Sequence, residues 1–282
     1  MKDITIEEKG YAKINLALHV TDVQEDGYHV LDSIVVFTDI FDCLSFKKTR
    51  KTVLTVSGEF AKSLNVKKNS VLQALNLFEK EISDHFSINL EKNLPLGAGL
   101  GGGSADAAAV IRFITNYCRH SMPSPKAITK IGADVPVCVS SIASRVGGIG
   151  EIVRPIDISG IDLWIVLVNP RIFVPTKSVF EGVIEKRNKP LEPMAHFNSS
   201  DQFIHYLRRQ RNDLQAIATN KWPQIKQVLD TIERTQDILL SRMSGSGSTC
   251  FGLYSSEETA KRAVTYIEKN SNKWWIKFSK VN

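Results

Sequence analysis

The chain has 282 residues, of which 43% are hydrophobic and 23% are charged, and its formal net charge is +6. These values are typical of a globular protein, and no apolar run reaches the roughly 18 residues that a membrane span needs. The length favours two domains, each with a substantial core. Residues 1–8 lack the apolar core of a secretory signal, so we expect a cytoplasmic protein with no membrane partner.

The cysteines and the positive charge exclude several classes of protein. The four cysteines stand singly, and no Cys-x-x-Cys pair is present, which argues against a disulfide scaffold and a structural zinc site. The one dense basic run, Lys47–Lys51, has no interleaved aromatic residues, which argues against nucleic-acid binding. We interpret this run as a solvated hairpin between two strands, and the positive charge as suited to phosphorylated small molecules.

The first informative segment, residues 11–20, alternates apolar and polar residues, which predicts a half-buried strand. Lys13 and Asn15 share its polar face, where they are either solvated or part of a site. A turn at 24–27 and a following strand complete a hairpin. Tyr28 and His29 open the second arm beside this turn, as edge residues or as ligand contacts.

The central feature is a glycine-rich stretch, Pro95–Asp106, between a strand-like run and a helix-like run. Asn69 is placed to cap an earlier helix. Five of the seven residues from 97 to 103 are glycine, which permits positive φ and a close approach of the backbone to a ligand. The following helix presents unpaired N–H groups and the positive end of its dipole. The stretch therefore predicts phosphate binding.

Two familiar phosphate-binding motifs fail in this context. The spacing Gly97-x-Gly99-x-x-Gly102 fits the dinucleotide fingerprint, but the acidic residue expected about 20 positions later is missing. A P-loop requires a lysine where Gly103 stands, so the cation that would engage the β- and γ-phosphates is absent from the loop. The missing cation has to come from elsewhere in the chain.

Beyond the glycine-rich stretch, Ser124 and the proline after it predict a short helix that ends at Gly132. Asp134 then precedes the apolar run 135–139, which we interpret as a strand. An aspartate among apolar neighbours is either a turn residue or a functional carboxylate. The glycine-rich run 144–151 predicts a flexible segment, and we place the domain change near residue 155.

The second half of the chain predicts a small α+β sandwich. Strands are expected at 163–168 and on both sides of Ser244–Thr249, and a last strand at 273–278. Helical runs lie between them, including one at 256–269. Three serines and two glycines in Ser244–Ser248 favour either a flexible turn or a second anion-binding loop.

These segments carry a resemblance to a known family. Pro95–Ser104 resembles the phosphate loop of the GHMP kinases, the superfamily of galactokinase, homoserine kinase, mevalonate kinase and phosphomevalonate kinase. Five other segments, in the same order, resemble the members that phosphorylate 4-diphosphocytidyl-2-C-methyl-D-erythritol: they are 12–16, 26–29, 132–136, 211–214 and 244–249. The resemblance runs from residue 11 to about residue 254.

The resemblance implies the fold and the activity. It implies a two-domain α+β GHMP kinase fold, with an N-terminal ribosomal-protein-S5-domain-2-like α/β domain over 1–155 and a C-terminal ferredoxin-like α+β domain over 156–282. It implies ATP-dependent phosphorylation of the 2-hydroxyl of the cytidyl substrate, with ATP and Mg²⁺ as cofactors and no dedicated metal ligands. The expected partner is that small molecule, with no nucleic acid, and the expected state is a monomer or weak homodimer.

The resemblance also assigns residues. Asp134 matches the catalytic base and Lys13 matches its charge partner, which supplies the missing cation. The residues expected to bind ATP are Asn69, Ser70, Val71, Pro95, Leu96, Gly97, Ala98, Gly99, Leu100, Gly101, Gly102, Gly103, Ser104 and Ala105. The residues expected to bind the acceptor substrate are Asn15, Tyr28, His29, Thr176, Phe180, Gly245 and Ser246. Ala105 departs from the family, which often has a second serine there.

Two alternatives stay open. Another GHMP activity, such as homoserine or mevalonate phosphorylation, would use the same fold, but the combination of Lys13, Tyr28 and His29 weighs against it. A non-catalytic nucleotide-binding or RNA-binding regulator would account for the basic charge. It would not require Lys13 and Asp134 together.

Overall fold

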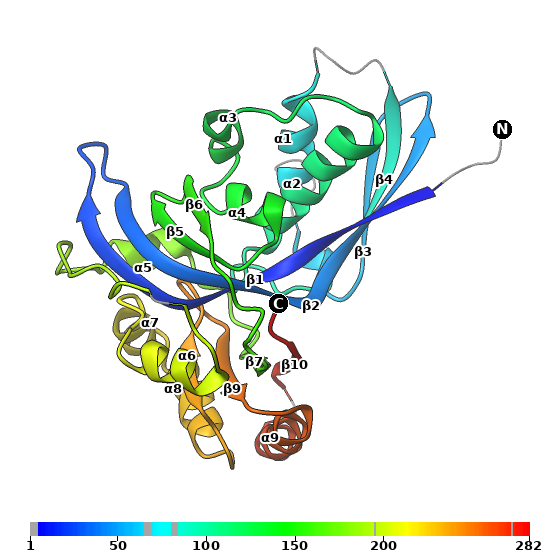
Figure 1. Cartoon of the computed structure of the whole chain (residues 1–282). Coiled ribbons are helices and arrows are strands. Elements are labelled where there is room, and N and C mark those ends of the chain that lie inside the picture. Colours follow the sequence, from blue (N-terminus) through cyan, green and yellow to red (C-terminus); the bar gives the residue numbers. More distant parts are fainter. Residues whose placement is uncertain (1–4, 65–68, 80–83, 195, 272) are drawn as a thin grey trace. The chain divides into compact units, whose positions relative to one another are not determined.

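The computed structural model describes residues 5–64, 69–79, 84–194, 196–271 and 273–282, which fall into two compact units (Figure 1). The segments of the first unit are Met1–Ala12, Phe41–Leu96 and Gly101–Ser141. The segments of the second are Lys13–Ile40, Gly97–Leu100 and Ile142–Asn282. Two long strands, β1 (Thr5–Val23) and β2 (His29–Thr49), each contribute to both units. The expected domain boundary near residue 155 stays a prediction.

The sheet of the first unit is built on the second half of β2. This half pairs antiparallel with β4 (His85–Glu91), and β4 pairs parallel with β3 (Val53–Ser57). The expected hairpin at Lys47–Lys51 is wrong, because β3 pairs with β4 and not with β2. The basic run is instead the end of β2 and a crossing to the far side of β4.

The helices of the first unit surround α2, which follows the glycine-rich stretch. They are α1 (Ser70–Asn76), α2 (Gly102–Arg112), a π-helical turn (Phe113–Tyr117), α3 (Pro125–Thr129) and α4 (Val135–Ser140), with a 3₁₀ turn at Ala61–Ser63. Both α1 and α4 pack against α2 (Figure 1). The expected caps are confirmed: Asn69 Oδ1 accepts from Val71 N, and Ser124 Oγ accepts from Ala127 N.

The run after Asp134 is a helix, so the strand expected there is wrong. Pro136 occupies the first turn of α4, where its missing N–H leaves no helix bond unmade. Val135, Val137 and Cys138 of this short helix are buried. A short apolar run fits a strand or a buried helix equally well, and only its tertiary partners decide between them.

In the second unit, the first half of β2 pairs antiparallel with β5 (Ser144–Gly148), and β5 pairs antiparallel with β6 (Ile152–Pro155). The flexible segment expected at 144–151 is therefore wrong, because these residues form a paired strand and its turn. Gly148 and Gly150 supply the positive φ values, +68° and +123°, that the turn requires.

The rest of the second unit is a four-stranded antiparallel sheet in the order β10-β7-β9-β8. Its strands are β7 (Trp164–Asn169), β8 (Leu240–Met243), β9 (Cys250–Tyr254) and β10 (Trp275–Lys280). Its helices are α5 (Thr176–Phe180), α6 (Ser200–Arg208), α7 (Gln215–Lys221), α8 (Pro223–Glu233) and α9 (Glu257–Asn270). Helices α8 and α9 pack against the sheet and bury an apolar core. The expected α+β arrangement is confirmed.

The helices that the structure describes are short. The longest described one, α9, has 14 residues and begins with a capping box at Ser256. A membrane-spanning helix needs about 20 predominantly apolar residues. Within the parts of the chain that the structure describes, no helix is long and apolar enough to cross a membrane.

Candidate active site

Lys13 and Asn15 lie on β1 in the second unit, and both are buried, at 3% and 4% exposure. The strand is buried on both faces from residue 12 to residue 20. The prediction of a half-buried strand with a polar face is therefore wrong. Lys13 Nζ donates to Asn15 Oδ1 at 2.7 Å, and Asn15 Nδ2 donates to Ser33 Oγ at 2.8 Å. Ser33 Oγ in turn donates to Ala17 O at 2.6 Å. These bonds fix the lysine, because buried polar groups need partners.

The middle of the glycine loop, Gly97–Leu100, also belongs to the second unit. Ser244 Oγ donates to Gly99 O at 2.9 Å, and Thr249 N donates to Ala98 O at 3.0 Å. Gly99 has φ +72°, and a Cβ there would lie 2.1 Å from Ser244 O. Only glycine allows this approach of two backbones. The two glycine-rich and serine-rich loops are therefore in direct contact.

The Ser244–Thr249 loop contacts the other acceptor-side residues. Asn15 Oδ1 is so close to Gly245 that a Cβ there would lie 3.1 Å from it. Ser246 Oγ lies 3.0 Å from Thr176 Oγ1. Asn212, from the segment 211–214, donates from Nδ2 to Gly245 O at 2.8 Å. Asn212 therefore shapes this loop, a role that its sequence position alone did not indicate.

His29 and Phe180 form an aromatic pair, with ring centroids 5.0 Å apart. His29 Nε2 is buried, and among the described residues it has no hydrogen-bond partner. Burial lowers the pKa of His29, and the positive charge of Lys186 lowers it further. Tyr28, the neighbouring residue, is 59% exposed. A ring nitrogen without a partner among the described residues, beside the Phe180 ring, is suited to a planar polar ligand.

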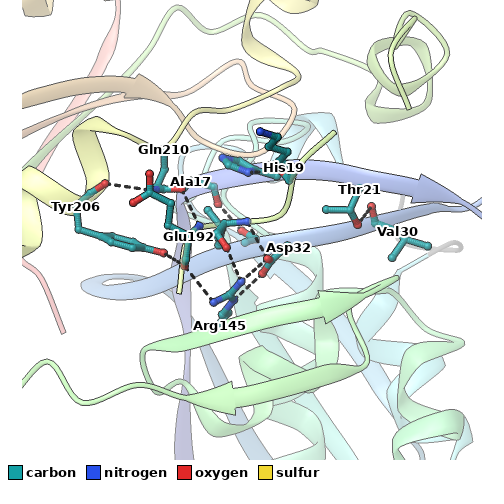
Figure 2. A network of polar contacts seen from close by, with 12 residues as sticks. Ala17, His19, Thr21, Val30, Asp32, Arg145, Glu192, Tyr206 and Gln210 are labelled. Atoms are coloured by element: carbon teal, nitrogen blue, oxygen red, sulfur yellow. Dashed lines mark hydrogen bonds and ion pairs between the residues drawn. The ribbon is translucent and has the colours of Figure 1, made fainter. Parts of the chain in front are cut away.

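A polar network fastens the segment between α5 and α6 to strands β2 and β5 (Figure 2). Arg145 donates from Nε to Asp32 Oδ1 at 2.8 Å and from Nη2 to Asp32 Oδ2 at 2.5 Å. The same Nη2 reaches Leu191 O at 3.0 Å, and Tyr206 Oη donates to Glu192 O at 2.8 Å. The segment that follows the aromatic pair is thus held by two buried or half-buried side chains.

In the first unit, the segment Asn69–Val71 contacts the start of α2. Ser70 Oγ donates to Gly103 O at 2.6 Å. Asn69 uses Oδ1 as the helix cap, and its Nδ2 is buried with no hydrogen-bond partner in the described part of the chain. This segment and the first turn of α2, both expected on the ATP side, are brought together.

The start of α2 has the geometry expected of a phosphate cradle. Gly101 precedes the helix with φ +64°, and the first helical bond runs from Ala105 N to Gly101 O at 2.8 Å. The N–H groups of residues 102–104 therefore have no partner within the helix. Gly103 is exposed, and among the described residues the nearest atom to a Cβ built there is Ser70 Oγ, at 3.5 Å.

Asp134 precedes α4 and is half-buried. The turn that carries it lies beside α2, because a Cβ at Gly132 would lie 3.2 Å from Ser104 Oγ. The expected catalytic residues thus belong to different units, Asp134 to the first and Lys13 to the second. Sequence interpretation missed Ser33, and it noted Ser244 only as part of the loop 244–248. It also missed the buried cluster of Asp42, Lys92 and Asp106 next to the glycine loop.

Comparison with known proteins identifies the class. The profile of the GHMP kinases N-terminal domain matches residues 69–150, and that of the GHMP kinases C-terminal domain matches residues 180–273. A homoserine kinase structure from Cytophaga hutchinsonii has the same fold, with a TM-score of 0.66 at 17% identity over 100% of this chain and 96% of the other. The chain therefore belongs to the GHMP kinases, a family of small-molecule kinases.

The resemblance to one group within this family is confirmed. Proteins named 4-diphosphocytidyl-2-C-methyl-D-erythritol kinase from Cereibacter sphaeroides and Ruegeria pomeroyi are 39% and 40% identical to the chain, covering 94% and 99% of it and 95% and 100% of the relatives. A crystal structure of 4-(cytidine 5'-diphospho)-2C-methyl-D-erythritol kinase superimposes with a TM-score of 0.80 at 26% identity, over 98% of this chain and 99% of that one. The expected two-domain fold is confirmed as well.

Proposed function

We propose that the chain transfers the γ-phosphoryl group of ATP to the 2-hydroxyl of 4-diphosphocytidyl-2-C-methyl-D-erythritol. The observation that carries this proposal is the near-complete coverage of relatives with this printed name at 39–40% identity. The homoserine and mevalonate kinase structures are only 15–17% identical, so they support the fold and not their own substrates.

The acceptor-side residues support a cytidyl ligand. Phe180 and Tyr28 offer aromatic faces for a pyrimidine ring, and His29 Nε2 offers a ring nitrogen that has no partner among the residues that the structure describes. Because burial lowers the pKa of His29, the ring is neutral at pH 7 and one of its nitrogens can accept a hydrogen bond. Asn15, Thr176, Gly245 and Ser246 would bind the rest of the acceptor.

The residues expected on the ATP side fit a nucleotide. Gly101–Gly103 and the start of α2 offer N–H groups to phosphates, and Asn69 Nδ2 is a buried donor without a partner in the described part of the chain. Bound with ATP, Mg²⁺ would neutralise charge on the β- and γ-phosphate oxygens. Among the residues that the structure describes, no group of three or more His, Cys, Asp or Glu is placed to hold a metal ion.

The chemical step assigned to this chain is a proton transfer coupled to an in-line displacement. The Asp134 carboxylate accepts the proton of the 2-hydroxyl, and that oxygen forms a bond to the γ-phosphorus. The bond from the γ-phosphorus to the β,γ-bridging oxygen breaks, and ADP leaves. Lys13, which donates to Asn15 Oδ1, is assigned the role of charge partner that the family resemblance implies, stabilising developing negative charge.

The function is tested by measuring ADP release with the cytidyl substrate, homoserine and mevalonate in parallel. We expect turnover with the cytidyl substrate alone. Turnover with either of the other alcohols and none with the cytidyl substrate would contradict the proposal. Salt-dependent retention of RNA without ATP turnover would instead favour a regulator.

The role of Asp134 is tested by Asp134→Asn, which keeps the size of the side chain and removes the base. We expect kcat to fall about 10²- to 10⁴-fold, the usual contribution of general-base catalysis, with little change in ATP affinity. Asp213→Asn is a matched control on a carboxylate outside the expected catalytic pair, and it should retain far more activity. If Asp134→Asn kept a kcat near that of the wild type, the assignment of Asp134 as the general base would be wrong.

A further inference from the structure

A lysine is fully buried between two carboxylates in the first unit. Lys92 Nζ donates to Asp42 Oδ2 and, at 2.8 Å, to Asp106 Oδ2. The Lys92 side chain is 1% exposed, and the two carboxylates are 0% and 2% exposed. Three charges so far from water are costly, and replacing such clusters with apolar residues is often neutral or stabilising. Their presence therefore calls for a reason other than stability.

Asp42 connects the lysine to the stem that leads into the glycine loop. Its second oxygen, Oδ1, accepts from Asn93 N at 2.6 Å and from Leu94 N at 2.8 Å. These two residues directly precede Pro95. One carboxylate therefore holds the lysine and the two backbone amides that set the direction of the stem.

Asp106 connects the same lysine to the other end of the loop. It lies near the N-terminal end of α2, four residues after Gly102. A Cβ at Gly102 would lie 3.0 Å from Lys92 Nζ, so the ammonium group rests against the first residue of the helix. Lys92 thus contacts α2 at two points, through Asp106 and at Gly102.

We propose that Lys92, Asp42 and Asp106 are positioning residues that hold both ends of the glycine loop at the separation needed to bind the phosphates of ATP. The cluster takes no part in the chemistry, and it rests on the proposed function only for the identity of the nucleotide. It acts through backbone: Asp42 fixes the stem, Asp106 fixes the start of α2, and Lys92 joins them. Removing the groups that orient metal ligands changes metal affinity or activity by about 10- to 100-fold, and we expect an effect of this order on ATP affinity.

The test cuts one of these links and leaves a balanced ion pair behind. Asp106→Ala removes the bond between Lys92 and α2, while Lys92 and Asp42 still pair with each other. We expect KM for ATP, and the ATP dissociation constant from calorimetry without acceptor, to rise about 10-fold or more. We expect kcat and KM for the acceptor to stay within about twofold. Asp106→Asn, whose amide oxygen can still accept from Lys92, should restore most of the ATP affinity.

A matched control lies at the opposite end of the same helix. Arg112 also links α2 to its surroundings, through Glu8 Oε2 at 3.0 Å and Cys138 O at 2.9 Å, but it is far along the helix from the glycine loop. Arg112→Ala should lower the melting temperature without changing KM for ATP. If Asp106→Ala does not fold, Asp106→Ser, which fills more of the space, replaces it in the same comparison.

The outcomes separate the inference from the proposed function. An unchanged ATP affinity in Asp106→Ala, or an equal loss in Arg112→Ala, would overturn the positioning role. The wild type could also bind ATP without turning over the cytidyl substrate, and this result would contradict the proposed function. If Asp106→Ala then bound ATP more weakly than the wild type, the positioning role would still be supported.

Discussion

The Lys92 cluster of the first unit and the Arg145 network of the second unit both fasten loops, and they differ in charge balance. In the first unit Lys92 lies between Asp42 and Asp106, so one cation faces two carboxylates. In the second unit Arg145 forms a bidentate pair with Asp32, the one carboxylate it contacts among the described residues, and it also donates to the backbone carbonyl of Leu191. The lysine side chain is 1% exposed and the arginine side chain 23% exposed.

The difference shows how a surplus charge makes a buried network sensitive to pH. Burial raises the pKa of Asp106 to about 7, the charge of Asp42 adds to this rise, and the charge of Lys92 opposes it. Although burial by itself lowers the pKa of Lys92, the two carboxylates outweigh it and raise that pKa. Arg145 keeps its charge at every accessible pH, since its hydrogen bond to Asp32 raises an already high pKa. The charge of the Lys92 cluster should therefore change with pH near neutrality, whereas Arg145 should stay charged over the same range.

The largest effect is expected from Lys92→Met, which leaves Asp42 and Asp106 buried without their cation. We expect the free energy of unfolding to fall by about 3–5 kcal/mol, the usual result of breaking a buried ion cluster. Urea unfolding followed by circular dichroism measures this change. Adding Asp106→Ala to Lys92→Met should recover part of the loss, because one uncompensated carboxylate then remains. If the double variant Lys92→Met, Asp106→Ala were less stable than Lys92→Met alone, the idea that the buried cluster carries a surplus carboxylate would be contradicted.

The next effect is a pH dependence that Asp106→Asn should remove. Because the pKa of Asp106 is higher in the folded state than in the unfolded state, its contribution to stability is fully present below about pH 4 and is lost as the pH rises towards 7. Between pH 5 and 7 the wild type should lose up to about 1.4 kcal/mol per pH unit relative to Asp106→Asn. Denaturant unfolding at several pH values measures this difference, and parallel curves would rule out the titration.

The smallest effect is expected from Arg145→Lys, which keeps the charge and loses the planar fork that Asp32 accepts. We expect the free energy of unfolding to fall by about 1 kcal/mol, because the site is partly exposed and water replaces some of the lost bonds. Since this network holds the segment after Phe180, KM for the acceptor should rise more than KM for ATP. A larger effect on ATP would contradict the separation of the two networks.

Local signals were predictable from the sequence, and tertiary pairing was not. The caps at Asn69 and Ser124 follow from a side chain and backbone amides two or three residues later, so they appear in the sequence itself. The strand expected after Asp134 is a helix, because packing against α2 decided the state of a short apolar run. The missed crossing after Lys47–Lys51 depends on the parallel pairing of β3 with β4.

The same contrast between local signals and tertiary pairing holds for the candidate site. The glycine loop was predictable because its residues are contiguous and only glycine supplies their backbone angles. The Lys92 cluster was not, because Asp42 lies 50 residues before the lysine and Asp106 lies 14 after it. The burial of Lys13 and Asn15 also lacked a local signal, since Ser33 and Ser244, which bond to Asn15, lie 18 and 229 residues away.

The position of Gly97–Leu100 in the second unit has a consequence for dividing the polypeptide. The carbonyls of Ala98 and Gly99 are bonded by Thr249 and Ser244, which lie about 150 residues further along the chain. A cut after residue 155 would therefore separate the nucleotide loop from the groups that shape its middle. We expect fragments 1–155 and 156–282 each to fail to bind ATP alone and to regain binding when they are refolded together. If ATP binding returns in this way, ATP binding by the glycine loop can be used to measure the association of the two fragments.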